Sequence, residues 1–135
     1  MKKVYVLLAD GFELIEALTP VDVLRRGGID VKTVSITSEK NIMSAQEVLV
    51  KADTTLKETD IKDGDMLVLP GGYPGYVNLG NSNEVVELVK FYVNNGKFVG
   101  AICGAPSILG NHDIAPGKKV TCHTSIKNLM KNYQY

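Results

Sequence analysis

The fold is decided by the stretch Phe98-Val99-Gly100-Ala101-Ile102-Cys103-Gly104-Ala105-Pro106, in which an apolar run stops abruptly at a cysteine. The first five residues have the character of a buried strand, and a helical pattern begins soon after Cys103. A strand that turns sharply into a helix can hold the residue at the turn in a strained conformation with its side chain exposed. Gly104 and Ala105 leave room for that bend and for a ligand. The stretch therefore predicts an α/β fold with Cys103 at a strand-to-helix turn.

The same turn predicts a reactive thiol. A helix that begins after the turn points unpaired backbone N–H groups and a partial positive charge at the sulfur. That environment favours the thiolate, which is the reactive form of cysteine, so Cys103 is a candidate nucleophile or redox centre. The alternative is a small buried core residue, because free cysteine is among the most buried residue types. This stretch alone leaves both interpretations open.

The composition limits the class of protein. A chain of 135 residues is long enough for one domain with one core, and 44% hydrophobic and 22% charged residues are ordinary for a folded domain. The formal net charge is zero and no lysine or arginine cluster stands out, so neither nucleic acid nor an anionic membrane is expected as a partner. No apolar run reaches the roughly 20 residues that cross a bilayer. Two cysteines make no disulfide framework, so we expect a cytoplasmic location.

Apolar periodicity predicts alternating strands and helices along the chain. Buried runs predict strands over residues 4–9, 31–36, 66–69, 98–102 and 119–122, with a short strand or hairpin within 44–53. Helical spacing predicts helices that begin at Leu14, Val85, Gly104 and Ile126, and Pro20 is expected to interrupt and kink the first of them. Alternating strands and helices imply βαβ units and a mostly parallel sheet that is covered on both faces.

The residues that follow the predicted strands are the candidate site. In open parallel sheets, ligands bind beyond the carboxyl ends of the strands. Four such segments follow strands here, namely residues 10–16, 70–75 and 103–106 and His123. We therefore expect all four to meet at one edge of the sheet.

Glu16 lies about one turn into the first predicted helix, from where its carboxyl group could approach Cys103. A carboxylate beside a thiolate is unfavourable, so one of the two groups must carry a proton, and burial raises the pKa of a carboxyl group. A protonated Glu16 could donate a hydrogen bond to the sulfur or pass a proton to a bound carbonyl compound. The alternative is an acidic residue that complements the helix dipole, which fits Glu13 somewhat better than Glu16.

Backbone groups and a histidine complete the candidate set. The N–H groups of Gly72 and Gly104 could point at one oxygen and stabilise an anion, although tight turns also need glycine. His123 could orient or deprotonate Cys103, although a lone histidine is more often structural. Cys122 and His123 do not form a zinc-binding spacing with Cys103, so no metal site is expected. The carboxylates after the first strand disfavour a flavin or nucleotide phosphate, and we expect no cofactor.

Taken together, these segments resemble the ThiJ/PfpI superfamily, in its DJ-one-like branch. The matching stretches run in family order through nearly the whole chain, at residues 10–16, 19–26, 69–72, 101–106 and 120–123. The resemblance implies a flavodoxin-like three-layer α/β sandwich with Cys103 at a nucleophile elbow. It also implies that Glu16 is the protonated carboxyl partner, that Gly72 and Gly104 supply backbone N–H groups, and that His123 lies close to the cysteine.

The resemblance also implies an activity. The expected function is that of a cysteine-dependent, cofactor-independent glyoxalase or deglycase that acts on small reactive carbonyl compounds such as methylglyoxal. The alternative is an oxidative-stress sensor or chaperone that uses the same cysteine. A cysteine peptidase is disfavoured, because the protease branch of the superfamily has a histidine directly after the cysteine, where this chain has Gly104.

Two expectations about assembly follow from the same resemblance. The first is a homodimer. Family members continue past the position of Tyr135 through another strand and a C-terminal helix, so we expect the single domain, residues 1–135, to be C-terminally truncated relative to the family and to lack those two elements. The second expectation is therefore a complementary C-terminal segment, since a sheet left uncovered would expose apolar surface.

Overall fold

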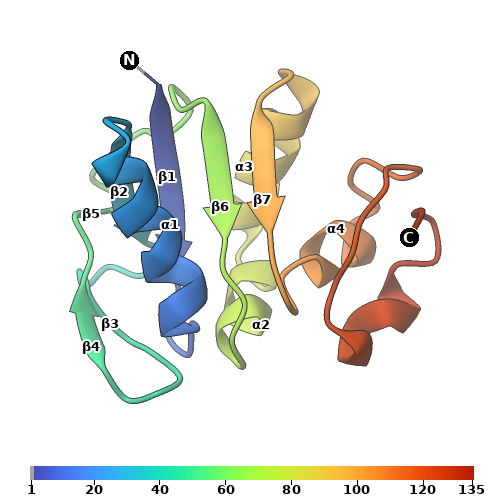
Figure 1. Ribbon diagram of the computed structural model, residues 1–135, viewed down its shortest axis with the longest axis horizontal. Coiled ribbons are helices and arrows are strands. Elements are labelled where there is room, and N and C mark those ends of the chain that lie inside the picture. The colour runs from blue at the N-terminus through green and yellow to red at the C-terminus, as the bar shows by residue number, and fades with distance from the viewer. Residues whose placement is uncertain (1) are drawn as a thin grey trace.

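A five-stranded, entirely parallel sheet forms the centre of the protein (Figure 1). The computed structural model describes residues 2–135. The strands lie in the order β5-β2-β1-β6-β7. Their bounds are β1 (Lys3–Leu8), β2 (Asp30–Ser35), β5 (Thr54–Thr55), β6 (Met66–Leu69) and β7 (Phe98–Ala101). A separate antiparallel hairpin is formed by β3 (Asn41–Met43) and β4 (Leu49–Lys51).

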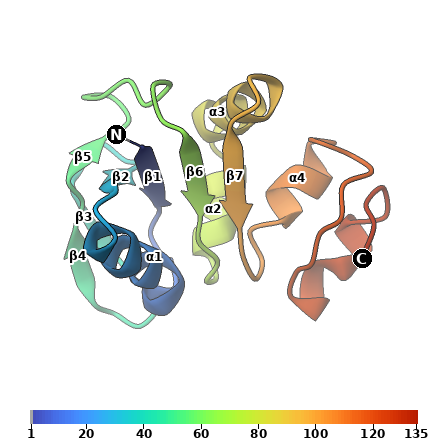
Figure 2. The same cartoon turned by 45° about the horizontal axis from the view of Figure 1, so that its top comes forward.

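Helices cover both faces of the sheet, as the views in Figures 1 and 2 show. On one face lies α1 (Leu14–Arg26), and on the other lie α2 (Gly75–Gly80) and α3 (Asn83–Asn94). Beyond the β7 edge lie α4 (Ser107–Asn111) and the 3-10 helix η1 (Thr124–Leu129). The predicted three-layer α/β sandwich is confirmed.

The two cores follow from the alternation of side chains along β1. Tyr5 and Leu7 join the core under α2 and α3. Val4, Val6 and Leu8 join a second core under α1. All five side chains are buried, because successive strand residues point to opposite faces and both faces are covered. This explains why the strand is a continuous apolar run in the sequence rather than an alternating one.

Most predicted elements are confirmed, and three differ. The first helix runs through Pro20 without a break. Proline removes only one backbone hydrogen bond of the helix, and the burial of Ala17 and Val21 against the sheet offsets that loss. The strand predicted over 119–122 does not form, because its residues bond to Gln134 near the end of the chain instead of extending the sheet. The helix predicted from residue 126 is the 3-10 helix η1.

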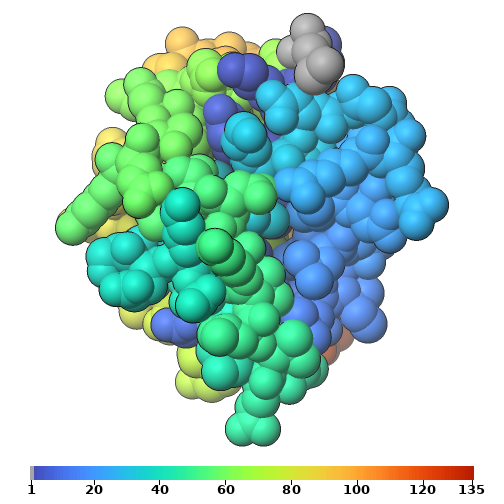
Figure 3. Space-filling model, turned by 90° about the vertical axis from the view of Figure 1, so that its left-hand side faces the viewer, coloured from blue at the N-terminus to red at the C-terminus, as the bar shows by residue number. Residues whose placement is uncertain are grey.

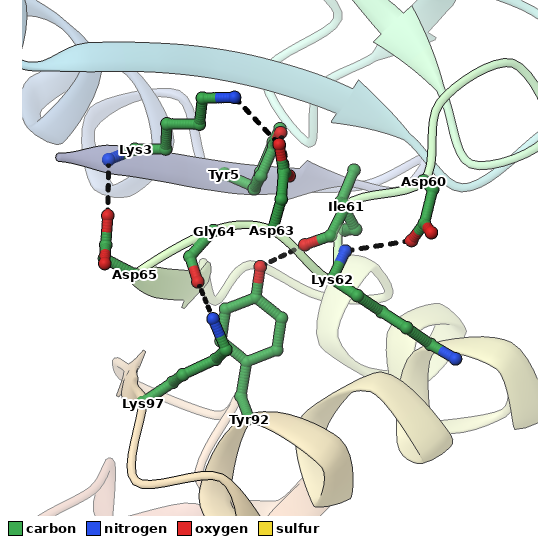
Figure 4. A network of polar contacts seen from close by, with 10 residues as sticks. All are labelled: Lys3, Tyr5, Asp60, Ile61, Lys62, Asp63, Gly64, Asp65, Tyr92 and Lys97. Atoms are coloured by element: carbon green, nitrogen blue, oxygen red, sulfur yellow. Dashed lines mark hydrogen bonds and ion pairs between the residues drawn. The ribbon is translucent and has the colours of Figure 1, made fainter. Parts of the chain in front are cut away.

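A polar network fixes the amino-terminal end of the sheet (Figure 4). Lys3 Nζ lies 2.8 Å from an oxygen of Asp63, and the Tyr5 hydroxyl donates to the same carboxylate at 2.7 Å. The buried Tyr92 of α3 donates its hydroxyl to the carbonyl of Ile61. These contacts tie the loop before β6 to both β1 and α3. The opposite, carboxyl-terminal end of the strands is left for the loops that follow them.

Candidate active site

The strand order places a crevice at the carboxyl ends of β1 and β6. The chain leaves β1 toward β2 and later returns to β6 on the other side of β1, and such a reversal is where ligands bind in open parallel sheets. The loops after the strands meet there. Glu13 N donates to the Gly71 carbonyl at 3.0 Å, and His123 N donates to the Cys103 carbonyl at 2.8 Å. The four segments predicted to meet do so.

Cys103 occupies a strained turn directly after β7. Its φ of 61° lies in the left-handed region that residues other than glycine rarely adopt. A non-glycine residue held there costs on the order of 1–3 kcal/mol, so the surrounding structure must enforce it. Ala105 N donates to the Ile102 carbonyl at 3.0 Å and closes the turn. The strained strand-to-helix turn expected from the sequence is present.

The sulfur of Cys103 lies between opposing electrostatic influences. Burial and the Glu16 carboxylate raise the pKa of the thiol, while hydrogen bonds from the N–H groups of Gly104 and Gly72 lower it. The net direction is upward. This differs from the expected lowering of the thiol pKa by a helix start, because α4 begins only at Ser107 and burial, the largest influence, acts together with the Glu16 carboxylate against the two N–H groups.

Glu16 reaches from the first turns of α1 to the loop after β6. Burial raises the pKa of its carboxyl group, and the hydrogen bond from Gly71 N, at 3.0 Å, lowers it in part. A Cβ atom on Gly71 would lie 2.5 Å from Glu16 Oε1 and 2.7 Å from Cys103 Cβ, so only glycine fits between the two side chains. Since each negative charge disfavours the other, the carboxyl group of Glu16 and the thiol of Cys103 compete for a proton. Glu16 is therefore an acid–base group beside the candidate nucleophile.

His123 faces the same cavity, with one ring nitrogen already engaged. Its Nδ1 accepts a hydrogen bond from Ser125 N at 3.1 Å and lies 2.8 Å from Ser125 Oγ. A neutral ring that accepts at Nδ1 carries its proton on Nε2. His123 caps η1 in this way and can donate from Nε2. This geometry favours the orienting role over removal of the Cys103 proton.

A cavity of about 220 Å³ opens above the sulfur. It is lined by Gly72, Tyr73, Tyr76, Cys103, Gly104, His123 and Ser125. The volume is below the roughly 300–1,000 Å³ of sites for drug-sized ligands, so it fits a small molecule. A larger cavity of about 570 Å³ lies against α3, but its lining holds no cysteine or histidine, and the chemistry favours the smaller one.

Sequence reasoning identified only part of this site. Gly71 and Tyr73 lie in the segment 70–75 that was expected to meet the others, although neither was assigned as a site residue, and Tyr76 and Ser125 were not predicted. In the structure these residues hold Glu16, line the cavity or fix His123. Tyr76 comes directly after the predicted segment, so the rule that ligands bind after strands could have found it with a slightly longer segment. The contact of Ser125 with the histidine ring depends on η1, which the sequence did not predict as a 3-10 helix.

Residues 2–135 form neither a metal-binding cluster nor a membrane-spanning helix. No group of three or more His, Cys, Asp or Glu side chains in that range lies close enough to hold a metal ion. No helix formed by those residues is both long and apolar enough to cross a bilayer.

Sequence comparison places the chain among known proteins. The DJ-1/PfpI family profile matches residues 2–135. The chain belongs to the DJ-1/PfpI family. Over 135 residues it is 36% identical to the protein dj-1beta of Drosophila melanogaster, covering 99% of this chain and 72% of that protein. Over 123 residues it is 35% identical to the glutathione-independent glyoxalase DJR-1.2 of Caenorhabditis elegans, covering 91% of this chain and 64% of that one.

Solved structures of DJ-1/PfpI proteins share the fold. A cysteine-to-alanine mutant of the DJ-1 superfamily protein STM1931 from Salmonella typhimurium is similar with a TM-score of 0.95 and 35% identity. The match covers all of this chain and 74% of that structure. Drosophila melanogaster DJ-1beta gives a TM-score of 0.94 at 35% identity, over 99% of this chain and 73% of that one. The predicted family and fold are confirmed, and the chain is shorter than these DJ-1/PfpI relatives.

Proposed function

We propose that this chain is a cysteine-dependent, cofactor-independent glyoxalase-like enzyme that converts small α-oxoaldehydes such as methylglyoxal to hydroxy acids. The observation that carries the proposal is the arrangement around Cys103, whose sulfur accepts hydrogen bonds from the N–H groups of Gly72 and Gly104 and is hydrogen-bonded to the carboxyl group of Glu16. A nucleophile, two anion-stabilising donors and a proton carrier thus meet at one small cavity. The related C. elegans protein, a glutathione-independent glyoxalase, supports this reaction class.

The reaction begins with addition of the Cys103 thiolate to the aldehyde carbon. The carbonyl electrons move to oxygen, where the N–H groups of Gly72 and Gly104 stabilise the charge, and Glu16 protonates that oxygen to give a hemithioacetal. The Glu16 carboxylate then removes the proton on the former aldehyde carbon and returns it to the neighbouring carbon, while the hydroxyl proton of the hemithioacetal passes to the ketone oxygen. The product is the thioester of a 2-hydroxy acid. Water hydrolyses the thioester to lactate and regenerates the thiol. Methylglyoxal and water are the only reactants consumed.

The experiment that tests this proposal compares the two cysteines of the chain. Cys103→Ala removes the nucleophile and is expected to lower the rate of lactate formation from methylglyoxal by at least about 100-fold. Cys122→Ala is the matched control and should retain the rate, because Cys122 contacts the Tyr135 hydroxyl and lies outside the cavity. Circular dichroism checks that both variants fold. Undiminished lactate formation by Cys103→Ala would overturn the proposal.

We further propose that the protein is a homodimer. The start of α1 and the β3–β4 hairpin lie side by side on one face (Figure 3), where Leu14 N donates to Gln46 Oε1 at 3.3 Å. Large apolar side chains are exposed on both elements, and such patches mark association surfaces. They are Ile15, Met43, Val48 and Leu49.

Other expectations stay predictions. They are the deglycase activity, the redox-sensor and chaperone alternatives, and the complementary C-terminal segment. The intact mass of the purified protein, with a search for a co-purifying peptide, tests the last of these.

A further inference from the structure

Two tyrosines form one wall of the cavity above Cys103. The rings of Tyr73 and Tyr76 meet edge to face, with centroids 6.0 Å apart and planes at 61°. Tyr73 is 71% exposed although it is a large aromatic residue, and Tyr76 is partly buried. Within residues 2–135, neither hydroxyl makes a hydrogen bond to another side chain or to the backbone. The two rings therefore contact each other, and most of Tyr73 remains exposed where it lines the cavity.

Tyr76 is fixed against the nucleophile turn. A Cβ atom built on Gly104 would lie 2.4 Å, 2.6 Å and 2.7 Å from the Cε1, Cδ1 and Cζ atoms of the Tyr76 ring. The ring therefore lies directly on the backbone of the residue after Cys103. Gly104 also donates its N–H to the sulfur position. A carbonyl group bonded to Cys103 with its oxygen near this N–H would have its substituent beside the two rings.

The lining of the cavity indicates which substituent fits. None of its seven residues carries a lysine, arginine or carboxylate side chain, so the lining offers no formal countercharge to a charged substituent. A methyl group is too small to contact both rings. A substituent ring can pack on them, because aromatic rings attract each other at centroid separations of about 4.5–7 Å. The volume of about 220 Å³ accommodates a single ring rather than a peptide.

We infer that Tyr73 and Tyr76 form an aryl subsite, which makes α-oxoaldehydes with an aromatic substituent, such as phenylglyoxal, the favoured substrate class over methylglyoxal. The inference rests on the proposed glyoxalase function and adds a specificity determinant to it. Tyr73 is the residue to test, because its exposure means that substitution leaves the fold intact. Tyr76 also borders a second cavity of about 450 Å³, so its removal would change more than the subsite.

The first test measures kcat/KM for phenylglyoxal and for methylglyoxal in the wild type, Tyr73→Leu and Tyr73→Phe. Leucine retains apolar area and removes the ring, so the ratio of the two kcat/KM values should fall by about 3- to 10-fold. Phenylalanine retains the ring and should retain the ratio. Tyr135→Leu, which changes an exposed tyrosine outside the cavity, is the matched control and should leave the ratio unchanged.

A second measurement does not depend on turnover. Benzamide and acetamide are unreactive carbonyl compounds that differ by an aryl against a methyl group, and each can protect Cys103 from alkylation by iodoacetamide. Benzamide should protect the wild type at a lower concentration than acetamide does, and Tyr73→Leu should narrow that difference by about 3- to 10-fold.

The outcomes separate the inference from the function on which it rests. If the wild type turns over both aldehydes and Tyr73→Leu does not change the ratio of their kcat/KM values, the aryl subsite is overturned. The glyoxalase proposal then remains intact. Lack of turnover in the wild type overturns the glyoxalase proposal, and the amide protection then decides the subsite by itself. The subsite is also overturned if Tyr73→Phe lowers the kcat/KM ratio, or the difference between the two amides, as much as Tyr73→Leu does, because phenylalanine keeps the ring.

Discussion

At the scale of single residues, the chemistry depends on where one proton sits. Burial raises the pKa of both Cys103 and Glu16, and the Glu16 charge raises that of the thiol further. Without hydrogen bonds from Gly72, Gly104 and Gly71, both groups would remain protonated over a wider pH range. The backbone N–H groups thus favour the thiolate of Cys103, and the negative charge of Glu16 disfavours it.

In the variant Glu16→Gln, we expect iodoacetamide to alkylate Cys103 faster and the protein to form lactate more slowly. The substitution removes the carboxylate that raises the thiol pKa, so the pH profile of iodoacetamide alkylation should shift to lower pH and the rate at pH 7 should rise severalfold. Lactate formation should fall by about 100-fold or more, because an amide cannot carry the proton. Alkylation kinetics over a range of pH and a lactate assay measure the two effects.

Two matched carboxylates serve as controls for this prediction. Glu13 also raises the pKa of Cys103, but less than Glu16 does, so Glu13→Gln should shift the alkylation profile less than Glu16→Gln. Asp22 pairs with Arg26 on the surface, and Asp22→Asn should not shift the profile. A Glu16→Gln profile that is unchanged or displaced to higher pH would contradict the assignment of Glu16.

The sequence predicts part of this site, for a physical reason. Cys103 and Glu16 stand out because a reactive residue type follows an apolar run, and strand ends meet at one edge. The tautomer of His123 could not be predicted, since it depends on a backbone N–H two residues later. The contact of Tyr76 with Gly104 could not be predicted either, because it joins residues that are far apart in the chain.

At the scale of elements, one carboxylate joins α1 to the sheet. Asp53 accepts hydrogen bonds from Thr33 N at 2.9 Å and from Arg25 Nη2 at 2.8 Å, and Arg25 also donates to the Val31 carbonyl at 2.8 Å. Burial raises the pKa of Asp53, but Thr33 and Arg25 together lower it below its ordinary value. The last turn of α1, β2 and the segment before β5 are therefore held by one charged group.

Asp53→Asn is expected to lower the free energy of unfolding by about 1–2 kcal/mol at pH 7, a value reduced by the partial exposure of the pair. Because the folded pKa of Asp53 lies below the ordinary 3.8, its contribution is present above that value and is lost as the pH falls through the folded pKa. Urea unfolding at pH 7 and near pH 3 should show the difference between wild type and variant shrinking in acid.

The control for this prediction is the exposed pair of Asp22 and Arg26. Asp22→Asn should cost no more than about 0.5 kcal/mol, because exposed ion pairs contribute little. If the loss in Asp53→Asn were the same at both pH values, the charge of Asp53 would not be its cause.

Elements differ in how far the sequence predicts them. Strands β1, β2, β6 and β7 were predicted within two residues. Of these, β1 and β6 are almost entirely apolar because the sheet is buried on both faces there. The six-residue helix α2 follows Pro74 and begins and ends with glycine, so it has no apolar helical period to detect. The two-residue strand β5 is too short for any pattern. The strand predicted over residues 119–122 does not form, because Lys119 pairs with Gln134 in an isolated bridge instead of joining the sheet.

At the scale of the whole molecule, two opposite sides expose apolar side chains. One is the α1 and β3–β4 face, where Ile15 is 71% and Leu49 is 56% exposed. The other is the β7 edge of the sheet, where Phe98 is 72% exposed. On the first side a helix and a hairpin lie next to each other (Figure 3), which suits a twofold contact in which the same patch meets itself. We therefore assign the proposed homodimer to the α1 and β3–β4 face.

Ile15→Glu and Leu49→Glu are expected to dissociate the homodimer, because each places a charge on both sides of a self-complementary apolar contact. Sedimentation velocity at several concentrations should show a dimer for the wild type and a monomer for either variant, with the far-UV spectrum unchanged. Phe98→Glu introduces the same charge at an equally exposed apolar position on the other side and should remain dimeric. A monomeric wild type would contradict the homodimer, and dissociation by Phe98→Glu alone would move the contact to the β7 edge.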